Sequence, residues 1–148
     1  MLETYLFLDI DGVLNSREAY KEQYKGKSQI HVICPKLVAR LNRIVKELGC
    51  KVVLSSIWRF NGLKMVQDKL DENNAEFQLI GRTSIYGRGR DRGEQIQEYM
   101  DEHNITAEQI VILDDDSDMV HLMPRLIQTT FEKGLQDEHV KKAIALFK

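Results

Sequence analysis

The sequence is poor in the residues that mark secreted, disulfide-rich and membrane-spanning proteins. Its only two cysteines, Cys34 and Cys50, have neither a CxxC partner nor a histidine cluster beside them. Two isolated cysteines in a chain of this size favour reduced thiols over a disulfide framework or a zinc site. No run approaches the roughly 18–20 consecutive apolar residues of a membrane span. The N-terminal segment has acids on both sides of its apolar run and no basic leader, so we expect a cytoplasmic protein without a membrane partner.

Strong net charge, low-complexity tracts and internal repeats are absent as well. The formal net charge is −2, and only two prolines occur in the chain. This mildly acidic balance argues against a protein that coats nucleic acid, but it says nothing about a local basic patch. What is present is the composition of an ordinary globular protein, with 43% hydrophobic and 30% charged residues. At 148 residues, we expect one domain over residues 1–148.

Apolar runs alternate with segments of helical spacing along the chain. The predicted strands are 5–8, 51–54, 77–80, 109–113 and 125–129. The predicted helices are 35–48, a segment opening at 61–62, 93–103, a short segment 119–123 that stops at Pro124, and a final segment through 140–147. Continuous apolar strands that alternate with helices indicate a parallel sheet covered on both faces. The expected fold is therefore α/β, a three-layer doubly wound architecture with a mostly parallel five-stranded sheet.

Polar residues follow three of the predicted strands where each strand ends. Asp9-Ile10-Asp11-Gly12 follows the first strand, Ser55-Ser56 follows the second, and the acidic run 114–118 follows the fourth. Parallel strands bring their carboxyl ends to one edge of the sheet, where ligands bind in open α/β folds. Crowded carboxylates repel one another unless a cation neutralises them. Hard oxygen ligands without cysteine or histidine indicate Mg²⁺ rather than Zn²⁺.

Each of these features also has a simpler explanation. Asp-Gly after a strand is a common turn signal, and the acidic run is also compatible with the solvated cap of a following helix. Neither segment has the ligand spacing of an EF-hand loop. The conjunction of three strand ends on one edge of the sheet nevertheless favours a functional site.

Four segments together resemble the motifs of the haloacid dehalogenase (HAD) superfamily. FLDIDGVLN resembles motif I, VVLSSIWR resembles motif II, the arginine of DRGEQI resembles the motif III cation, and VILDDDSD resembles motif IV. The resemblance covers residues 5–118. It is nearest to the capless HAD domains of RNA-repair and phage proteins, with a more distant similarity to the phosphatase domain of polynucleotide kinase-phosphatases.

The resemblance implies roles for the acidic residues. Asp9 is the expected nucleophile, which forms an aspartyl-phosphate, and Asp11 is the expected general acid and base. Mg²⁺ is expected to bind Asp9, the backbone carbonyl of Asp11 and a carboxylate of the acidic run. Asp115 is the favoured ligand in that run, with Asp114 and Asp118 as supports, and the register of consecutive acids stays open by one residue.

Hydroxyl groups and arginines complete the expected site. The resemblance implies that Ser55 binds a phosphoryl oxygen and that Arg92 offsets the charge of the phosphate. The stretch YGRGRDRG brings further arginines, which match phosphate geometry bidentately, although a solvated glycine-rich loop is the alternative. Trp58 either stacks on a substrate or packs in the core, the commoner place for a single tryptophan. The expected substrate-binding residues are Gly12, Ser56, Arg59, Arg82, Arg88 and Arg90.

The spacing of the motifs leaves no room for a cap domain of usual size. Only nineteen residues, 16–34, separate motif I from its helix, and their polar side chains either cover a substrate or form ordinary surface (Tyr20, Lys21, Tyr24, Lys25, Lys27). An open site suits a phosphate on a polymer end. The first interpretation is thus an HAD-type phosphatase that acts on a terminal phosphate of a nucleic acid or nucleotide. The alternatives are a phosphatase of small nucleotides or phosphoproteins, and a non-catalytic module that binds nucleic acid or a partner. The oligomeric state stays open.

Overall fold

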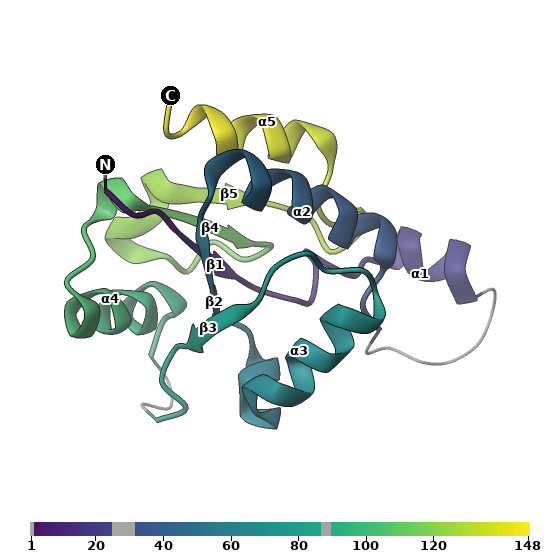
Figure 1. Cartoon of the computed structure of the whole chain (residues 1–148), viewed down its shortest axis with the longest axis horizontal. Coiled ribbons are helices and arrows are strands. Elements are labelled where there is room, and N and C mark those ends of the chain that lie inside the picture. Colours follow the sequence, from purple (N-terminus) through teal and green to yellow (C-terminus); the bar gives the residue numbers. More distant parts are fainter. Residues whose placement is uncertain (1, 25–31, 87–89) are drawn as a thin grey trace.

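A single parallel sheet organises the chain. The structure is a computed structural model that describes residues 2–24, 32–86 and 90–148. Its strands lie in the order β3-β2-β1-β4-β5, and every neighbouring pair is parallel. This confirms the predicted doubly wound α/β fold with five strands (Figure 1). The strands are β1 (Tyr5–Leu8), β2 (Lys51–Leu54), β3 (Leu79–Arg82), β4 (Ile110–Asp114) and β5 (Leu126–Gln128).

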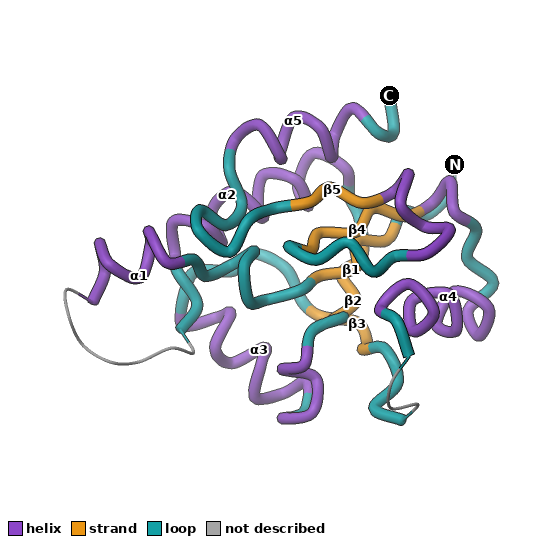
Figure 2. The backbone as a smooth tube through the Cα atoms, turned by 180° about the vertical axis from the view of Figure 1, so that it is seen from behind, coloured by secondary structure: helices purple, strands orange, loops and turns teal. Residues whose placement is uncertain are grey.

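Helices cover both faces of the sheet (Figure 2). One face packs against α2 (Pro35–Leu48), α3 (Leu63–Glu72) and α5 (Asp137–Ala145). The other face packs against α4 (Arg92–His103) and a 3₁₀ helix, Val120–Arg125. The remaining elements are α1 (Arg17–Tyr24) and two short 3₁₀ helices, Ile57–Asn61 and Ala107–Gln109. The sheet and the helices on its two faces form the three predicted layers, with one hydrophobic cluster on each side of the sheet.

The central strands are buried on both faces and aligned at their ends. Leu8 pairs with Leu54 of β2 and with Leu113 of β4, and Leu54 pairs with Arg82 of β3. The ladder continues beyond the strands, because the Ser55 N–H donates to the Leu8 carbonyl. The residues that follow β1, β2, β3 and β4 are therefore brought into line at one edge of the sheet.

The third strand begins two residues later than predicted. Phe77 is apolar, as the prediction required, but it packs into the core before the strand starts. The Gln67 side chain accepts the Leu79 N–H at 2.7 Å and donates to the Phe77 carbonyl at 3.1 Å, so a helix side chain replaces the ladder there. A register shift between Val52 and Val53 accompanies the change. The strand then runs on to Arg82, and the following loop emerges at the carboxyl edge of the sheet.

Two helical segments also differ from the sequence pattern. Helix α1 was not predicted, because its polar residues show no apolar spacing. Its first turn is capped by the Ser16 hydroxyl, which accepts the Ala19 N–H. Pro124 was expected to stop the short helix after β4, but it lies inside the 3₁₀ helix Val120–Arg125. Pro124 is the last residue but one of this 3₁₀ helix, and so short a helix tolerates a residue that cannot donate a backbone hydrogen bond.

The elements between the motifs contain no large cap. Across the ranges that the structure describes, the segment between β1 and α2 holds only α1, and the segment between β2 and α4 holds the 3₁₀ helix Ile57–Asn61, α3 and β3. Lys25, Lys27 and Arg88 lie outside the described residues. In residues 2–24, 32–86 and 90–148, no helix combines the length and the apolar character that crossing a bilayer requires.

Candidate active site

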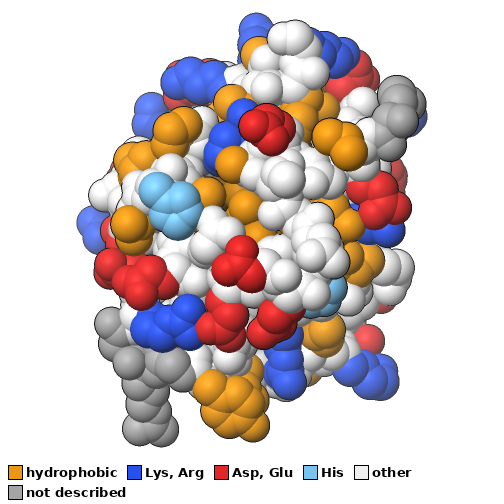
Figure 3. Space-filling view, turned by 90° about the vertical axis from the view of Figure 1, so that its left-hand side faces the viewer, with side chains coloured by type: hydrophobic (Ala, Val, Ile, Leu, Met, Phe, Trp, Pro, Cys, Tyr) orange, Lys and Arg blue, Asp and Glu red, His pale blue; other side chains and the backbone are white. Residues whose placement is uncertain are grey.

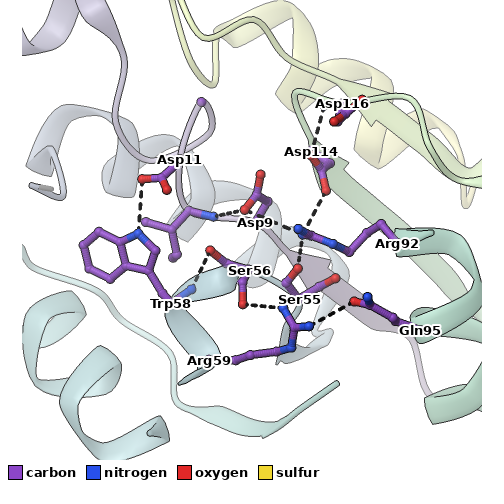
Figure 4. Close-up of polar contacts among 12 residues, drawn as sticks. Asp9, Asp11, Ser55, Ser56, Trp58, Arg59, Arg92, Gln95, Asp114 and Asp116 are labelled. Atoms are coloured by element: carbon purple, nitrogen blue, oxygen red, sulfur yellow. Dashed lines mark hydrogen bonds and ion pairs between the residues drawn. The ribbon is translucent and has the colours of Figure 1, made fainter. Parts of the chain in front are cut away.

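A row of polar side chains lines the carboxyl edge of the sheet on the α4 side. Successive residues of a strand point to opposite faces. Phe7, Val53 and Ile112 belong to the cluster that packs against α4. Asp9, Ser55 and Asp114, each two residues further along, therefore return to that same face. The sequence prediction that three separate strand ends meet at one edge is confirmed (Figure 4).

Three carboxylates form the centre of this row. Asp9, Asp114 and Asp115 each place one carboxylate oxygen within 4.8 Å of the others. Burial and the charge of Asp114 raise the pKa of Asp9 to about 9, and burial raises the pKa of Asp114 to about 6. Burial also raises the pKa of Asp115. A divalent cation among these oxygens would offset the repulsion among the three carboxylates, so the donor set fits a hard metal ion.

The structure shows which acids of the run 114–118 belong to the carboxylate cluster. Asp114 and Asp115 both belong to the cluster, whereas Asp118 lies at the start of α4, where its carboxylate accepts the Arg92 N–H at 3.1 Å. An acid at a helix N-terminus stabilises the helix. Asp116 donates its N–H to Asp114 Oδ1 at 3.0 Å and so fixes that carboxylate. Asp118 thus supports α4 rather than the carboxylate cluster itself.

Gly12 makes room for one of these acids. A Cβ atom at this position would lie 2.3 Å from Asp115 Oδ2, and the glycine has a φ of +82° that other residues rarely adopt. Asn15 closes the same turn: its Oδ1 accepts the Gly12 N–H at 2.9 Å. The glycine of DIDG is therefore needed both for the backbone turn and for the approach of the motif IV loop.

Arg92 is the cation that faces the carboxylates. Its Nη1 lies 3.3 Å from Asp114 Oδ2 and 3.8 Å from Asp9 Oδ1, and it also donates to the Ser55 carbonyl. The Ser55 hydroxyl is buried beside it and has no hydrogen-bond partner within the described part of the chain. A buried hydroxyl without a partner is uncommon and indicates a missing ligand group or water. Ser55 and Arg92 are thus placed to bind an anionic group next to Asp9.

Asp11 lies on the opposite side of Asp9 from Arg92 (Figure 4). One oxygen, Oδ1, receives two hydrogen bonds, from Asn15 Nδ2 at 2.8 Å and from Trp58 Nε1 at 3.1 Å. Because both donors hold the same oxygen, the carboxyl group is fixed in one orientation with respect to the nucleophile. Within the described ranges its carboxylate is not a member of the three-acid cluster. That Asp11 offers a metal only its backbone carbonyl stays a prediction.

Arg59 is placed beneath the site and not on its open surface. Its side chain is 4% exposed and donates to the Ser84 carbonyl, the Ser56 carbonyl and Gln95 Oε1 at 3.0–3.2 Å. The guanidinium therefore joins the exits of β2 and β3 to α4. This geometry corrects the expected contact with substrate, because the donors of Arg59 are already engaged inside the protein. The side chain acts as a brace.

Arg82 and Arg90 also form hydrogen bonds with groups of the protein. Arg82 Nη1 donates to the Arg59 carbonyl at 2.7 Å, and Arg90 pairs with Glu98 and donates to the Glu94 carbonyl at 3.2 Å. Arg90 is thus directed along α4 and away from the carboxylates. The Ser56 hydroxyl accepts the Trp58 N–H at 3.2 Å and caps the 3₁₀ helix. Among the expected arginines in the described residues, only Arg92 forms an ion pair with Asp9.

Two residues of the site were not identified from the sequence. Trp58 was assigned either to stacking or to the core, and no role was given to Asn15; both hold Asp11. The role of Asn15 could have been found from the DGVLN motif, because Asn15 is its last residue and its side chain contacts Asp11, four positions earlier. The tryptophan contact joins residues 47 positions apart, which no local pattern reveals.

The family of the chain follows from a comparison of its whole length. A family model of the HAD domain in Swiss Army Knife RNA repair proteins matches residues 5–140. The chain belongs to this HAD family. The match includes all four motifs and extends through the start of α5. No curated protein sequence matches the chain.

Solved HAD structures share the fold at low sequence identity. A protein of Mesorhizobium loti assigned as an HAD-like phosphatase has a TM-score of 0.56 and 16% identity, over 98% of this chain and 86% of that protein. A β-phosphoglucomutase of Clostridium difficile has a TM-score of 0.54 and 11% identity, over 98% of both chains. At such identities the likeness concerns the fold. Family membership and the clustered acids together make the chain an HAD-type phosphatase.

Proposed function

We propose that this HAD domain is a Mg²⁺-dependent phosphomonoesterase that acts through an aspartyl-phosphate on Asp9. The observation that carries the proposal is the arrangement around that carboxylate. Two further acids lie within 4.8 Å, Arg92 faces it, and the buried Ser55 hydroxyl beside it lacks a partner. A nucleophile, a cation, a hydroxyl donor and a metal-binding cluster are the groups that phosphoryl transfer requires.

The residues present fit a bound Mg²⁺ ion. Its ligands would be the carboxylates of Asp9 and Asp115, the backbone carbonyl of Asp11, and Asp114 as a direct or supporting ligand. The raised pKa of Asp9 and the close approach of Asp115 that Gly12 permits both support a cation here. When bound, Mg²⁺ would polarise the phosphoryl group and neutralise charge that develops on its oxygens.

The first chemical step uses Asp9 and Asp11. A carboxylate oxygen of Asp9 attacks phosphorus, and the bond between phosphorus and the leaving oxygen breaks. Asp11 donates its proton to that oxygen, which leaves as an alcohol. Trp58 and Asn15 hold Asp11 Oδ1, and this leaves the other oxygen, Oδ2, to carry the proton.

The second step reverses the roles of the two acids. Asp11, now ionised, takes a proton from water while the water oxygen attacks phosphorus. The bond between phosphorus and Asp9 breaks, inorganic phosphate leaves, and Asp11 regains its proton. In both steps the Ser55 hydroxyl donates to a phosphoryl oxygen and Arg92 offsets negative charge.

The proposed substrate is a phosphate at the end of a nucleic acid or on a nucleotide. The family description, an HAD domain of RNA repair proteins, supports this class, and so does the absence of a large cap over the site in the described residues. We propose that the domain spans residues 1–148 and works in the cytoplasm. Because Arg59 is engaged inside the protein and Arg90 pairs with Glu98 on α4, contacts with the substrate would fall to other residues.

The test is phosphate release from one panel of substrates, with and without Mg²⁺. The panel holds oligonucleotides with a 3′- or 5′-phosphate, nucleoside monophosphates, a phosphopeptide and an aryl phosphate. We expect turnover that needs Mg²⁺, with preference for the nucleic acid ends, and none from the Asp9→Asn variant. Turnover by that variant, or no turnover of any member by the wild type, contradicts the proposal.

A further inference from the structure

A cleft adjoins the site on the side of Asp11. It has a volume of about 290 Å³ and is lined by Ile57, Trp58, Asn61, Met65 and Lys69. These residues come from the 3₁₀ helix after β2 and from α3, and we refer to the hollow as the α3 cleft. Pockets for drug-sized ligands run to about 300–1,000 Å³, so the α3 cleft fits one ring system better than an extended chain.

Trp58 connects the α3 cleft to the chemistry. Its ring borders the cleft, while its Nε1 donates to Asp11 Oδ1 at 3.1 Å. In phosphoryl transfer the attacking and leaving oxygens lie roughly in line with phosphorus. Asp11 protonates the leaving oxygen in the proposed mechanism, so the rest of the leaving group must lie beside Asp11. The α3 cleft is therefore one indole ring away from the place where the leaving group departs.

The lining of the α3 cleft is apolar at one part and cationic at another. Ile57 is 58% exposed and Met65 is 45% exposed, which leaves apolar surface open to solvent next to the buried Trp58. Asn61 adds an amide that can both donate and accept hydrogen bonds. Lys69 pairs with Glu72 only at 3.7 Å and half in solvent, and such a surface pair is readily exchanged for another anion. The lining matches a planar group followed by a negative charge.

The opposite flank of the site has the wrong charge for a polyanion. A hollow over α4 is lined by four acids, Glu94, Glu98, Asp101 and Glu102, against one arginine, Arg90, with Gln97 and His121, and Figure 3 shows acidic side chains on that side of the molecule. Like charge disfavours a phosphate chain there. The lining of the α3 cleft, by contrast, contains Lys69 and no acid, so it is the more favourable of the two hollows for the body of an anionic substrate.

We propose that the α3 cleft binds the terminal nucleoside of a phosphorylated nucleic acid end, with Lys69 pairing with the next phosphate. The inference rests on the proposed function, because the nucleoside is the leaving group of that reaction. The base lies against the apolar surface of Ile57 and Met65. Contacts between bases and apolar or aromatic side chains tolerate any base, so the cleft selects for a nucleoside and not for a sequence.

The test compares three phosphomonoesters that share the reacting group. Glycerol 3-phosphate has no ring, thymidine 3′-monophosphate adds the nucleoside, and a dinucleotide with a 3′-phosphate adds the second phosphate. We expect Met65→Ser to raise KM about tenfold for both nucleotides and to leave glycerol 3-phosphate unchanged. We expect Lys69→Gln to raise KM only for the dinucleotide, and to weaken its dependence on salt.

Matched variants and a fourth substrate make the result decisive. Lys64→Gln on the same helix, and Met123→Ser on the 3₁₀ helix after β4, should change none of the three KM values. Equal effects of Met65→Ser on all three substrates, or none, overturn the α3 cleft as a nucleoside site. A larger effect on a phosphotyrosine peptide than on the nucleotides overturns it in favour of an aryl side chain. Where the wild type prefers 5′-phosphates, the same comparison uses thymidine 5′-monophosphate and a dinucleotide with a 5′-phosphate. If the wild type hydrolyses neither set with Mg²⁺, the proposed function itself has failed.

Discussion

Single residues in this site are constrained by neighbours from distant parts of the chain. Gly12 and Asp115 illustrate this, because the acid occupies the space where a side chain at position 12 would begin. Asp11 and Trp58 are a second case, joined by a hydrogen bond between motif I and motif II. Motif spacing predicts which residues reach the edge of the sheet, but these contacts depend on packing.

Gly12→Ala should separate backbone strain from loss of the metal site. The variant adds a Cβ that meets Asp115 Oδ2 and forces alanine to a positive φ, a strain of about 1–2 kcal/mol. We expect it to lower stability by at least that amount and Mg²⁺ affinity by about tenfold or more. Urea unfolding and calorimetric titration with Mg²⁺ measure the two effects.

Gly49→Ala is the matched control for this substitution. Gly49 also has a positive φ, +60°, but nothing lies within 4 Å of the position of its added Cβ. It should lose stability and keep Mg²⁺ affinity. If both variants retain the affinity of the wild type, the close approach of Asp115 has no role in binding metal.

The sequence predicts which side chains gather at the site better than it predicts which way they turn. Asp9, Ser55 and Asp114 follow from the ends of strands, which periodicity reveals, and Arg92 follows from the resemblance of its segment to motif III. Arg59 was expected to face a substrate because arginine matches phosphate. In the fold, the Arg59 guanidinium donates to three acceptors inside the protein, on Ser56, Ser84 and Gln95. No local sequence pattern predicts that these three acceptors lie around it.

Among the elements, α5 depends on a histidine at its first turn. The His139 Nδ1 accepts the backbone N–H of Gln136 at 2.9 Å, and the Gln136 side chain caps the same turn. Burial lowers the pKa of His139, since the charged ring is disfavoured in this position. The histidine must stay neutral to keep the cap, which makes the start of α5 sensitive to acid.

The pH dependence of stability should therefore respond to His139. Its pKa is lower in the folded state than the usual value near 6.5 in the unfolded chain, so the unfolded state binds more protons as the pH falls. Stability contributed by the neutral ring is complete above about pH 6.5 and is lost as the pH falls towards the folded pKa. We expect His139→Gln, which keeps a capping acceptor without titrating, to reduce the loss between pH 7 and 5.

Unfolding in urea at several pH values measures this difference. His121→Gln is the control, because His121 is exposed and bonds only the Gln97 side chain in the described structure. It should leave the slope of stability against pH unchanged. An equal slope for the wild type and His139→Gln would show that another group causes the acid sensitivity.

Element boundaries follow the sequence where the pattern is strong. Both ends of α2 agree with the proline at its start and Gly49 at its end, and β1 and β2 match their apolar runs. The start of β3 was predicted two residues too early, because Phe77 is an apolar residue of the core that lies before the strand. The Gln67 side chain forms the hydrogen bonds of the backbone there. Such a replacement of ladder bonds by a side chain leaves no periodic signal.

At the scale of the whole molecule, Arg59 ties together the segments that carry the site. It connects the loop after β2, the loop after β3 and the first turns of α4. Arg59→Lys removes the planar fork that reaches three acceptors and leaves two or more of them buried and unpaired. We expect a loss of about 2–3 kcal/mol in the free energy of unfolding.

Arg43→Lys is the control that distinguishes loss of the Arg59 contacts from a general effect of replacing arginine by lysine. Arg43 is exposed and pairs with Asp137 at 2.9 Å, so Arg43→Lys should change stability by no more than about 0.5 kcal/mol. Both variants are measured by urea unfolding. A similar small change for Arg59→Lys would mean that the buried guanidinium is not the connection we describe.

The architecture as a whole could be predicted because it depends on repeated, local signals. Alternating apolar runs and helical spacings gave the five parallel strands, and the strand ends gave the position of the site. The side of the molecule that receives a leaving group could not be predicted, since it depends on α3, α4 and the distribution of charge over both. That property belongs to the assembled surface.

The central claim is that Asp9 becomes phosphorylated during turnover. The most direct measurement is to quench the enzyme with acid in the steady state, with Mg²⁺ and a phosphorylated oligonucleotide, and to locate any phosphoryl group by mass spectrometry of its peptides. We predict a phosphoryl group on Asp9, absent without Mg²⁺ and absent from the Asp9→Asn variant. Release of phosphate with a phosphoryl group on another residue, or undiminished release by Asp9→Asn, would contradict the account.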